Sequence, residues 1–185
     1  MIKEAVQDAD RRMRSAIQSL QEDLAGIRTG RANPGLVEKL SVEYYGSPVP
    51  LIQLATISVP EPRQLLIKPF DATSIKDIDR AIQSSSLGLT PANDGKVIRL
   101  NLPVLTEERR HELSKFVNNR LEEARVAVRN VRRDAIKDLR EFESEKLISK
   151  DDLKRGEEDT QKLTDKIVEE INSIGTEKEK EIMEV

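Results

Sequence analysis

Proline is confined to the middle of this chain, and that confinement constrains the fold more than any other feature. All eight prolines lie between Pro34 and Pro103, and none occurs in residues 1–33 or 104–185. Because proline lacks a backbone N–H and clashes inside a helix, long proline-free segments favour helices. The pattern predicts a helical body interrupted by an inserted, non-helical domain. The two chain crossings between these parts are a candidate hinge.

Both flanks of the proline block carry helical periodicity. Apolar residues from Val6 to Ile27 recur every three or four positions, which predicts an amphipathic helix that ends near Gly30. Thr106 followed by two acids resembles a helix start, and the periodicity then runs to Phe142, giving one helix of about 38 residues. A break at residues 148–151 precedes a last helix, whose expected apolar stripe consists of Leu153, Leu163, Ile167, Ile171 and Ile174.

The middle block alternates between short strand patterns and turn residues, with one short helix. Ser74 and Asp77 predict a capping box at the start of that helix, which continues to Ile82. The predicted strands are Leu40–Tyr45, Ala55–Val59, Gln64–Lys68 and Lys96–Leu102.

These elements together predict an α+β fold. Three long amphipathic helices bury their apolar stripes most simply as an antiparallel three-helix bundle. The predicted bundle is discontinuous and comprises residues 1–30 and 105–185. The predicted inserted domain comprises residues 31–104 and is a small α+β domain. The hinge is expected at Gly30, Arg31, Val104, Leu105 and Thr106.

Composition and motifs argue against several classes of site. The chain has no cysteine and one histidine, His111, which leaves no means of building a thiolate or histidine metal cluster. The glycines around Pro34 have the spacing of a phosphate loop, but Leu36 and Val37 stand where that loop needs lysine and a hydroxyl residue. The carboxylates lie in solvated runs such as residues 157–159. We therefore predict no catalytic residue, no metal and no cofactor, so the protein is not expected to be an enzyme.

No signal for a membrane or for export is present in the sequence. No apolar run approaches the roughly 18 residues that span a bilayer. The first eight residues include acids and lack the apolar segment of a signal peptide. The sequence therefore predicts a cytoplasmic protein.

Charge is distributed unevenly over the two C-terminal helices. Residues 109–140 contain ten basic and five acidic residues, whereas residues 141–185 contain eight basic and fifteen acidic residues. On a helical wheel with Arg110 at zero, the apolar stripe centres at roughly 330° and most acids fall at roughly 200–280°. Glu122 and Arg120 break this separation. Five arginines occupy roughly 40–140°, and they are Arg125, Arg129, Arg132, Arg133 and Arg140.

The residues alone leave two interpretations of this arginine flank open. Charged side chains on a bundle helix can simply be a solvated face. Arginine, however, presents a planar fork that grips phosphate oxygens in pairs, and acids are predicted to lie away from the cluster. From Arg110 to Arg133 the flank is about 35 Å long, which suits an extended nucleic-acid backbone. Arg28 and Arg31, at the turn after the first helix, are further candidates for phosphate contact.

Five motifs, in order along the whole chain, resemble the ribosome recycling factor family. One departure is Phe70, where many relatives have tryptophan, and another is Ile167, where tyrosine is common; both keep an apolar packing residue. The motifs are Arg28–Pro34, Tyr44–Leu51, Leu105–Arg110, Val128–Asp134 and Lys178–Val185.

The resemblance implies a fold and a task. Members of this family are L-shaped and have tRNA-like dimensions, with a three-helix bundle joined by a two-stranded hinge to a β/α/β domain. They bind the large ribosomal subunit after termination and, with elongation factor G and GTP hydrolysis, split the ribosome and free it from mRNA. The resemblance implies a monomer that uses no cofactor. It assigns ribosomal RNA contacts to Arg110, Arg129 and Arg132, and more loosely to Arg28, Arg31 and Arg133; Arg125 joins this set by its place on the flank.

Two other functions remain as alternatives. One is a helical adaptor that binds a partner protein through its acidic C-terminal helix. The other is a hydrolase whose site the sequence does not reveal, which a single histidine and the absence of cysteine make a poor fit. Salt-sensitive binding to large ribosomal subunits would separate the recycling function from both.

Overall fold

The computed structural model describes residues 1–184 and divides the chain into two compact units. The first unit comprises Met1–Arg28 and Thr106–Glu184, and the second unit begins at Thr29 and ends at Leu105. Val185, the last residue of the predicted bundle segment, lies outside the described residues. The predicted fold class, an α+β chain with a long helical bundle and a small sheet domain, is confirmed.

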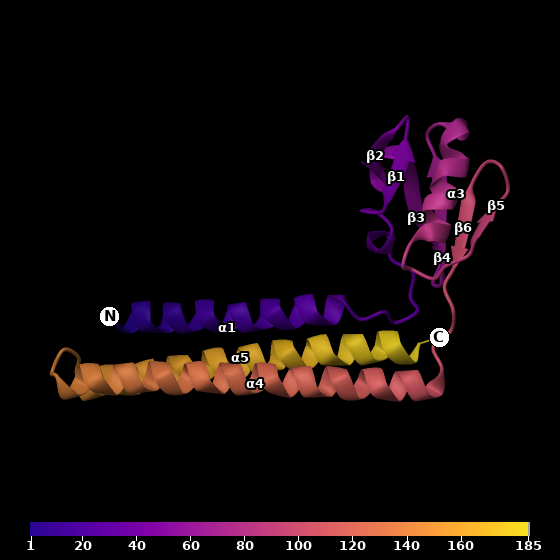
Figure 1. Cartoon of the computed structure of the whole chain (residues 1–185). Coiled ribbons are helices and arrows are strands. Elements are labelled where there is room, and N and C mark those ends of the chain that lie inside the picture. The colour runs from indigo at the N-terminus through magenta and orange to yellow at the C-terminus, as the bar shows by residue number, and fades with distance from the viewer. Residues whose placement is uncertain (185) are drawn as a thin grey trace. The chain divides into compact units, whose positions relative to one another are not determined.

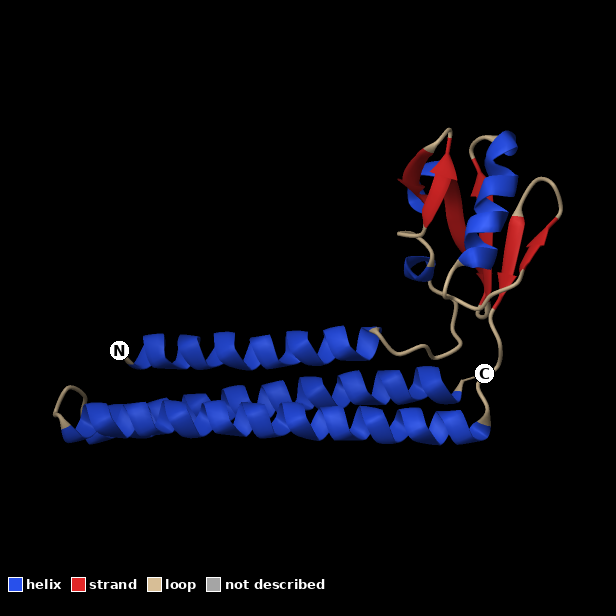
Figure 2. Cartoon of the chain, viewed as in Figure 1, coloured by secondary structure: helices blue, strands red, loops and turns tan. Residues whose placement is uncertain are grey.

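The first unit is a bundle of three long helices (Figures 1 and 2). Its helices are α1 (Ile2–Ala25), α4 (Glu107–Ser144) and α5 (Lys150–Met183). Helix α4 runs antiparallel to the other two, and all three pairs of helices are in contact. The antiparallel direction follows from the short connection between α4 and α5.

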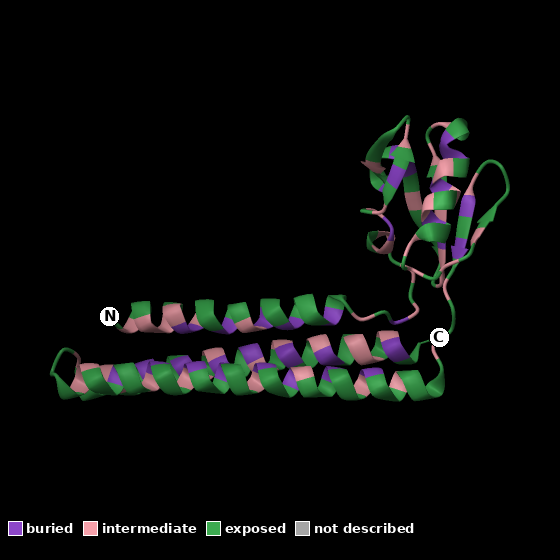
Figure 3. Ribbon diagram, in the orientation of Figure 1, coloured by how far each residue is buried: buried purple, intermediate pink, exposed green. Residues whose placement is uncertain are grey.

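Buried side chains form a continuous stripe along the inner side of each helix of the bundle (Figure 3). The predicted periodicity of α1 and α4 matches this stripe, because the residues at steps of three and four are the buried ones. Burial of these apolar side chains is the main stabilising contribution to the bundle. The fully buried members include Met13, Leu20, Val117, Val128, Leu139, Ile167, Ile171 and Ile182.

The buried stripe of α5 differs from the predicted one. Leu153, Leu163 and Ile174 are only partly buried. Small residues take their place, because a Cβ at Gly175 would lie 2.3 Å from Leu121 Cδ1, so only hydrogen fits there without a shift. The buried hydroxyls bond to carbonyls one turn earlier in the helix, which satisfies them internally. The small buried residues of α5 are Gly156, Thr160, Thr164 and Gly175.

The helix ends are set by local hydrogen bonds. Helix α1 ends at Ala25, several residues before the predicted end near Gly30, which itself lies beyond the helix with φ of +77°. The predicted N-cap of α4 is confirmed, since Thr106 Oγ1 accepts a hydrogen bond from Arg109 N at 3.1 Å. Helix α5 begins with a capping box in which Ser149 and Asp152 bond reciprocally.

The second unit contains two antiparallel sheets. A two-stranded sheet pairs β1 (Ser41–Tyr44) with β2 (Ser47–Pro50). A four-stranded sheet has the order β3-β4-β6-β5. The sequence predicted β1, β3, β4 and β6 but missed β2 and β5, which are short and begin or end at proline. The four strands of the larger sheet are β3 (Ala55–Glu61), β4 (Gln64–Pro69), β6 (Ile98–Asn101) and β5 (Pro91–Asn93).

Helix α3 (Ile75–Ser84) packs Ile75, Ile78 and Ile82 into the core of this unit. The predicted capping box at Ser74 is wrong, because Ser74 has helical backbone angles and makes no side-chain cap bond. Asp71 caps instead, accepting a hydrogen bond from Thr73 N at the start of a 3₁₀ turn, Ala72–Ser74, that leads into α3. The other short helical segments are α2 (Leu51–Leu54) and a 3₁₀ turn at Pro34–Leu36.

Candidate nucleic-acid interface

The arginine flank of α4 lies along the seam with α5. Arg125 donates from Nε and Nη2 to Asn172 Oδ1 of α5, at 3.1 and 2.7 Å. Arg140 pairs with Glu157 of α5 at 2.9 Å. The apolar stripe of α4 faces the core of the bundle. The arginines beside that stripe therefore lie next to the neighbouring helix, α5.

The opposite flank of α4 lies along α1, and there the acids have basic partners. Asp134 pairs with Arg12 of α1 at 2.7 Å, and this hydrogen bond raises the pKa of Arg12 above its usual value. Arg120 bridges Asp23 of α1 and Glu123 of α4, at 2.6 and 2.7 Å. The two flanks of one helix therefore face different neighbours.

The prediction that acids lie away from the arginines is only partly right. Glu122, on the arginine flank, contacts Arg125 Nη1 through one carboxylate oxygen and Arg129 Nη1 through the other, both at 3.3 Å. Glu157 reaches Arg140 from α5. A helical wheel of α4 cannot reveal the contact between Glu157 and Arg140, because Glu157 lies on α5. Arg125, Arg129 and Arg140 thus have partners within the protein.

Arg110, Arg132 and Arg133 differ from those three arginines. Within residues 1–184 they form no ion pair and no side-chain hydrogen bond that the structure records. The Nε atoms of Arg110 and Arg132 are moreover buried without an acceptor. Leaving a buried donor unpaired costs about 1–3 kcal/mol. Both guanidinium groups are thus without a recorded acceptor in residues 1–184.

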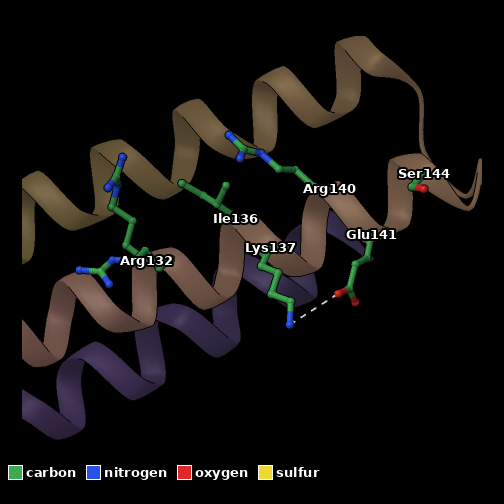
Figure 4. Close-up of a pocket in the computed structure, with 7 residues that line it drawn as sticks. Arg132, Ile136, Lys137, Arg140, Glu141 and Ser144 are labelled. Atoms are coloured by element: carbon green, nitrogen blue, oxygen red, sulfur yellow. Dashed lines mark ion pairs between the residues drawn. The ribbon is translucent and has the colours of Figure 1, made fainter.

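A shallow groove of about 460 Å³ lies at the C-terminal part of the arginine flank (Figure 4). Ile136 forms an apolar patch within it, and Figure 4 shows Ile136 and Arg140 directed toward α5. Lys137 lies on the other side and pairs with Glu141 at 3.8 Å. Sequence reasoning did not include Ile136 and Lys137 in the site. The residues that line this groove are Arg132, Arg133, Ile136, Lys137, Arg140, Glu141 and Ser144.

A second groove of about 460 Å³ runs along the seam between α4 and α5. Arg129 and Arg132 line its α4 side. Asp165 and Glu169 line its α5 side, so the groove carries both signs of charge. Arg133 lines only the first of these two grooves, whereas Arg132 lines both.

The structure does not bring all predicted site residues together. Arg129, Arg132 and Arg133 lie on adjacent turns of α4, and Arg110 lies in the first turn of the same helix. Arg28 is exposed after α1 in the first unit, whereas Arg31 is exposed in the second unit. Neither Arg28 nor Arg31 lies on α4.

The two predicted crossings approach each other within the second unit. A Cβ at Gly30 would lie 3.3 Å from the carbonyl oxygen of Pro103 and 3.5 Å from Leu105 Cγ. Each crossing is also fixed to the β3–β4 turn, through Ala32 N to the Pro62 oxygen at 2.7 Å and Leu102 N to the Arg63 oxygen at 2.8 Å.

Two kinds of feature are absent from the described part of the chain. None of the helices in residues 1–184 combines the length and apolarity needed to cross a membrane. Over the same residues, no group of three or more acidic or histidine side chains is arranged to hold a metal ion.

Comparison with known proteins decides the family. A family model described as "Ribosome recycling factor" matches residues 20–183. The chain belongs to the ribosome recycling factor family. Ribosome-recycling factors from Halalkalibacterium halodurans and from Roseiflexus sp. (strain RS-1) are 57% and 54% identical to it over 185 residues, and each alignment covers all of both chains.

Solved structures of the family have the same fold. A solution structure of a ribosome recycling factor is 47% identical, with a TM-score of 0.75, and the match covers 100% of this chain and 98% of that one. A second match is described as "Models for the T. thermophilus ribosome recycling factor and the E. coli elongation factor G bound to the E. coli post-termination complex". It has 43% identity, a TM-score of 0.64 and 99% coverage of both chains.

Proposed function

We propose that this recycling factor binds the large ribosomal subunit of the post-termination complex through the outer arginines of α4. Together with elongation factor G and GTP hydrolysis, it splits the ribosome into subunits and releases it from mRNA. Membership of the family supports this proposal, as does the relative that is described with elongation factor G on a post-termination complex. Energy for splitting comes from GTP on the partner, and the factor itself catalyses no reaction.

The observation that carries the proposal is the pair of unsatisfied arginines, Arg110 and Arg132. Within residues 1–184 no ion pair or side-chain hydrogen bond is recorded for either guanidinium group, so the donors of both remain without a protein acceptor. A phosphate group offers several acceptor oxygens and matches the guanidinium fork. The 22 residues between the two arginines span about 33 Å of helix, so they contact separate phosphates of a long RNA surface.

The other arginines have different tasks. Arg133 is exposed and has no partner in residues 1–184, which suits it to a further phosphate contact. Arg129 is half-exposed and held only by Glu122. Arg125 is three-quarters buried and bonded twice to Asn172, so we assign it to the α4–α5 seam and not to RNA.

The test is the double variant Arg110→Ala plus Arg132→Ala. Losing two phosphate contacts should weaken binding to isolated large subunits by at least about tenfold. The slope of log K against log [salt] should become shallower by about 1.4–1.8. Splitting of post-termination complexes by the variant with elongation factor G and GTP should fall in parallel.

The control is Arg11→Ala plus Arg12→Ala, which removes the same charge from α1. It should bind within about twofold of the wild type, because those side chains pair with Asp8 and Asp134. Normal binding and splitting by the α4 double variant would refute the proposal. A helical adaptor acting through the acidic α5 would show no salt-sensitive binding to large subunits.

We also propose that the two crossings, Gly30–Arg31 and Val104–Thr106, form a hinge between the bundle and the inserted domain. The hydrogen bonds of Ala32 and Leu102 to the β3–β4 turn fix the chain on the domain side of each crossing. Residues 102–106 have no regular secondary structure, so changes in φ and ψ there disturb few contacts. Elongation factor G acts on this joint in the proposed mechanism.

Two glycines offer a matched test of the hinge. Gly30 has φ of +77° and little room for a Cβ, whereas Gly26 has φ of −73° and ordinary spacing. Gly30→Ala should therefore slow splitting while large-subunit binding stays within about twofold, and Gly26→Ala should change neither. Unimpaired splitting by Gly30→Ala at wild-type stability would argue against the hinge.

A further inference from the structure

Glu122 is the acid of α4 that lies among the arginines, and its contacts are unlike those of the other acids of this helix. One carboxylate oxygen contacts Arg129 and the other contacts Arg125, each at 3.3 Å. Asp134 and Glu123, on the other flank, pair at 2.7 Å with Arg12 and Arg120. The Glu122 contacts are thus longer and weaker, and Glu122 and Arg129 are each more than half exposed.

The two arginines that Glu122 contacts are held very differently. Arg125 also donates two hydrogen bonds to Asn172, and these do not involve Glu122. Arg129 has no other recorded partner within residues 1–184, so Glu122 alone occupies its guanidinium. The carboxylate is therefore anchored beside a fixed arginine and sits where Arg129 would otherwise receive an external anion.

We propose that Glu122 is an internal counter-anion that phosphate must displace from Arg129, and that it thereby limits the affinity of the factor for ribosomal RNA. This inference rests on the proposed function. A carboxylate and a phosphate oxygen use the same guanidinium donors. When RNA binds, one ion pair is exchanged for another, and the released carboxylate remains close to the negatively charged backbone.

The exchange has a consequence for salt dependence. Arg129 releases a counterion from RNA when it neutralises a phosphate, but the freed Glu122 attracts a cation in return. The net release at this contact is therefore close to zero in the wild type. Without the Glu122 charge, the slope of log K against log [salt] should steepen by about 0.7–0.9.

Glu122→Gln tests the inference, because glutamine keeps the shape and removes the charge. Its affinity for isolated large subunits should rise by about two- to fivefold at low salt, which corresponds to an exposed ion pair. The gain should shrink at high salt, and dissociation should be slower. Glu123→Gln removes the same charge from the flank beside α1 and should bind within about 1.5-fold of the wild type.

Arg129→Ala decides whether the effect passes through Arg129. In that background Glu122→Gln should bring no gain in affinity. The inference would be overturned by weaker or unchanged binding of Glu122→Gln, by an equal gain from Glu123→Gln, or by a gain that persists without Arg129. Weaker binding would mean that Glu122 positions Arg129 for RNA.

Failure of the proposed RNA interface and failure of the role of Glu122 give different results. If Arg110→Ala plus Arg132→Ala leaves binding normal, the proposed RNA interface fails. If that variant weakens binding while Glu122→Gln brings no gain, only the role of Glu122 fails. Unfolding midpoints of Glu122→Gln and Arg129→Ala should stay close to the wild type, since both side chains are more than half exposed and make weak contacts.

Discussion

The charged side chains on the two flanks of α4 belong to the same helix but have different kinds of partner. Beside α1, Asp134 of α4 pairs with Arg12 of α1, and Arg120 of α4 pairs with Asp23 of α1. Beside α5, Arg125 bonds to an amide and Arg140 to an acid, whereas Arg110, Arg132 and Arg133 have no recorded partner within residues 1–184. A chain with a net charge of −3 can therefore present a basic surface. Net charge alone is a poor guide to such a surface.

The largest effect on this comparison is expected from Gly175 of α5, where a Cβ would lie 2.3 Å from Leu121 Cδ1 of α4. Gly175→Val should destabilise the protein by about 2–3 kcal/mol, because the new side chain meets buried Leu121 and forces the helices apart. Ser173→Val, on the exposed side of α5, carries the same β-branched penalty without the clash. Urea unfolding of both variants measures the difference. Equal midpoints would show that the α4–α5 spacing is not fixed by this glycine.

Next in size is the contact between Arg125 and Asn172. Arg125→Leu should lower the free energy of unfolding by about 1 kcal/mol, because two hydrogen bonds across the α5 seam are lost. Arg133→Leu is the matched control, since Arg133 is exposed, and it should change stability by less than about 0.5 kcal/mol. A similar cost for both would mean that Arg125 is not part of the seam and should be returned to the RNA-contacting set.

A smaller, pH-dependent effect is expected at the start of α5, which has a capping box, whereas α1 has no side-chain cap. Hydrogen bonds from Ser149 lower the pKa of Asp152 below the usual 3.8. Asp152→Asn should therefore unfold at lower urea than the wild type at pH 7. The difference should vanish as the pH falls through the titration range of this carboxyl, because the protonated acid no longer stabilises the cap.

The control for this experiment is Asp151→Asn, which removes a neighbouring acid of the first turn that does not belong to the box. Helix-dipole interactions give it a weaker effect at pH 7. If both variants lose the same stability, or if the Asp152→Asn difference persists at acid pH, the box does not explain the lowered pKa.

The smallest effect is expected beside α1, at the pair of Arg12 and Asp134. Both side chains are about half exposed, so a double-mutant cycle with alanine should give a coupling of about 0.2–1 kcal/mol. Large-subunit binding should hardly change. A coupling above that range, or a loss of binding, would show that the α1 flank is more than a neutralised surface.

Much of the fold could be predicted from the sequence because local signals are strong. The proline block, the periodicity of α1 and α4 and the Thr106 cap each depend on neighbouring residues, and the structure has all three. The errors arose where short-range patterns compete. Asp71 starts a 3₁₀ turn before α3 and thereby replaces the predicted Ser74 cap. Strands β2 and β5 are held by pairing with partners that a local pattern does not contain.

The candidate site was predicted in part. A helical wheel placed five arginines on one flank of α4, and two of them, Arg125 and Arg140, contact α5 in the structure. It could not separate Arg132 from Arg125, because the difference lies in Asn172 on another helix. Nor could it assign Glu122 to Arg129 as a partner, since side chains seven positions apart meet only when their rotamers allow it.

The sequence by itself determined which segments are helical, which residues line the apolar stripes of α1 and α4, and on which flank of α4 the arginines lie. These properties follow from spacing and from the chemistry of single residues. Only the tertiary structure decided which arginines keep free donors, and that α5 packs through Gly156, Thr160, Thr164 and Gly175. Both depend on atoms brought within a few ångströms by chain packing, and local spacing does not encode such contacts.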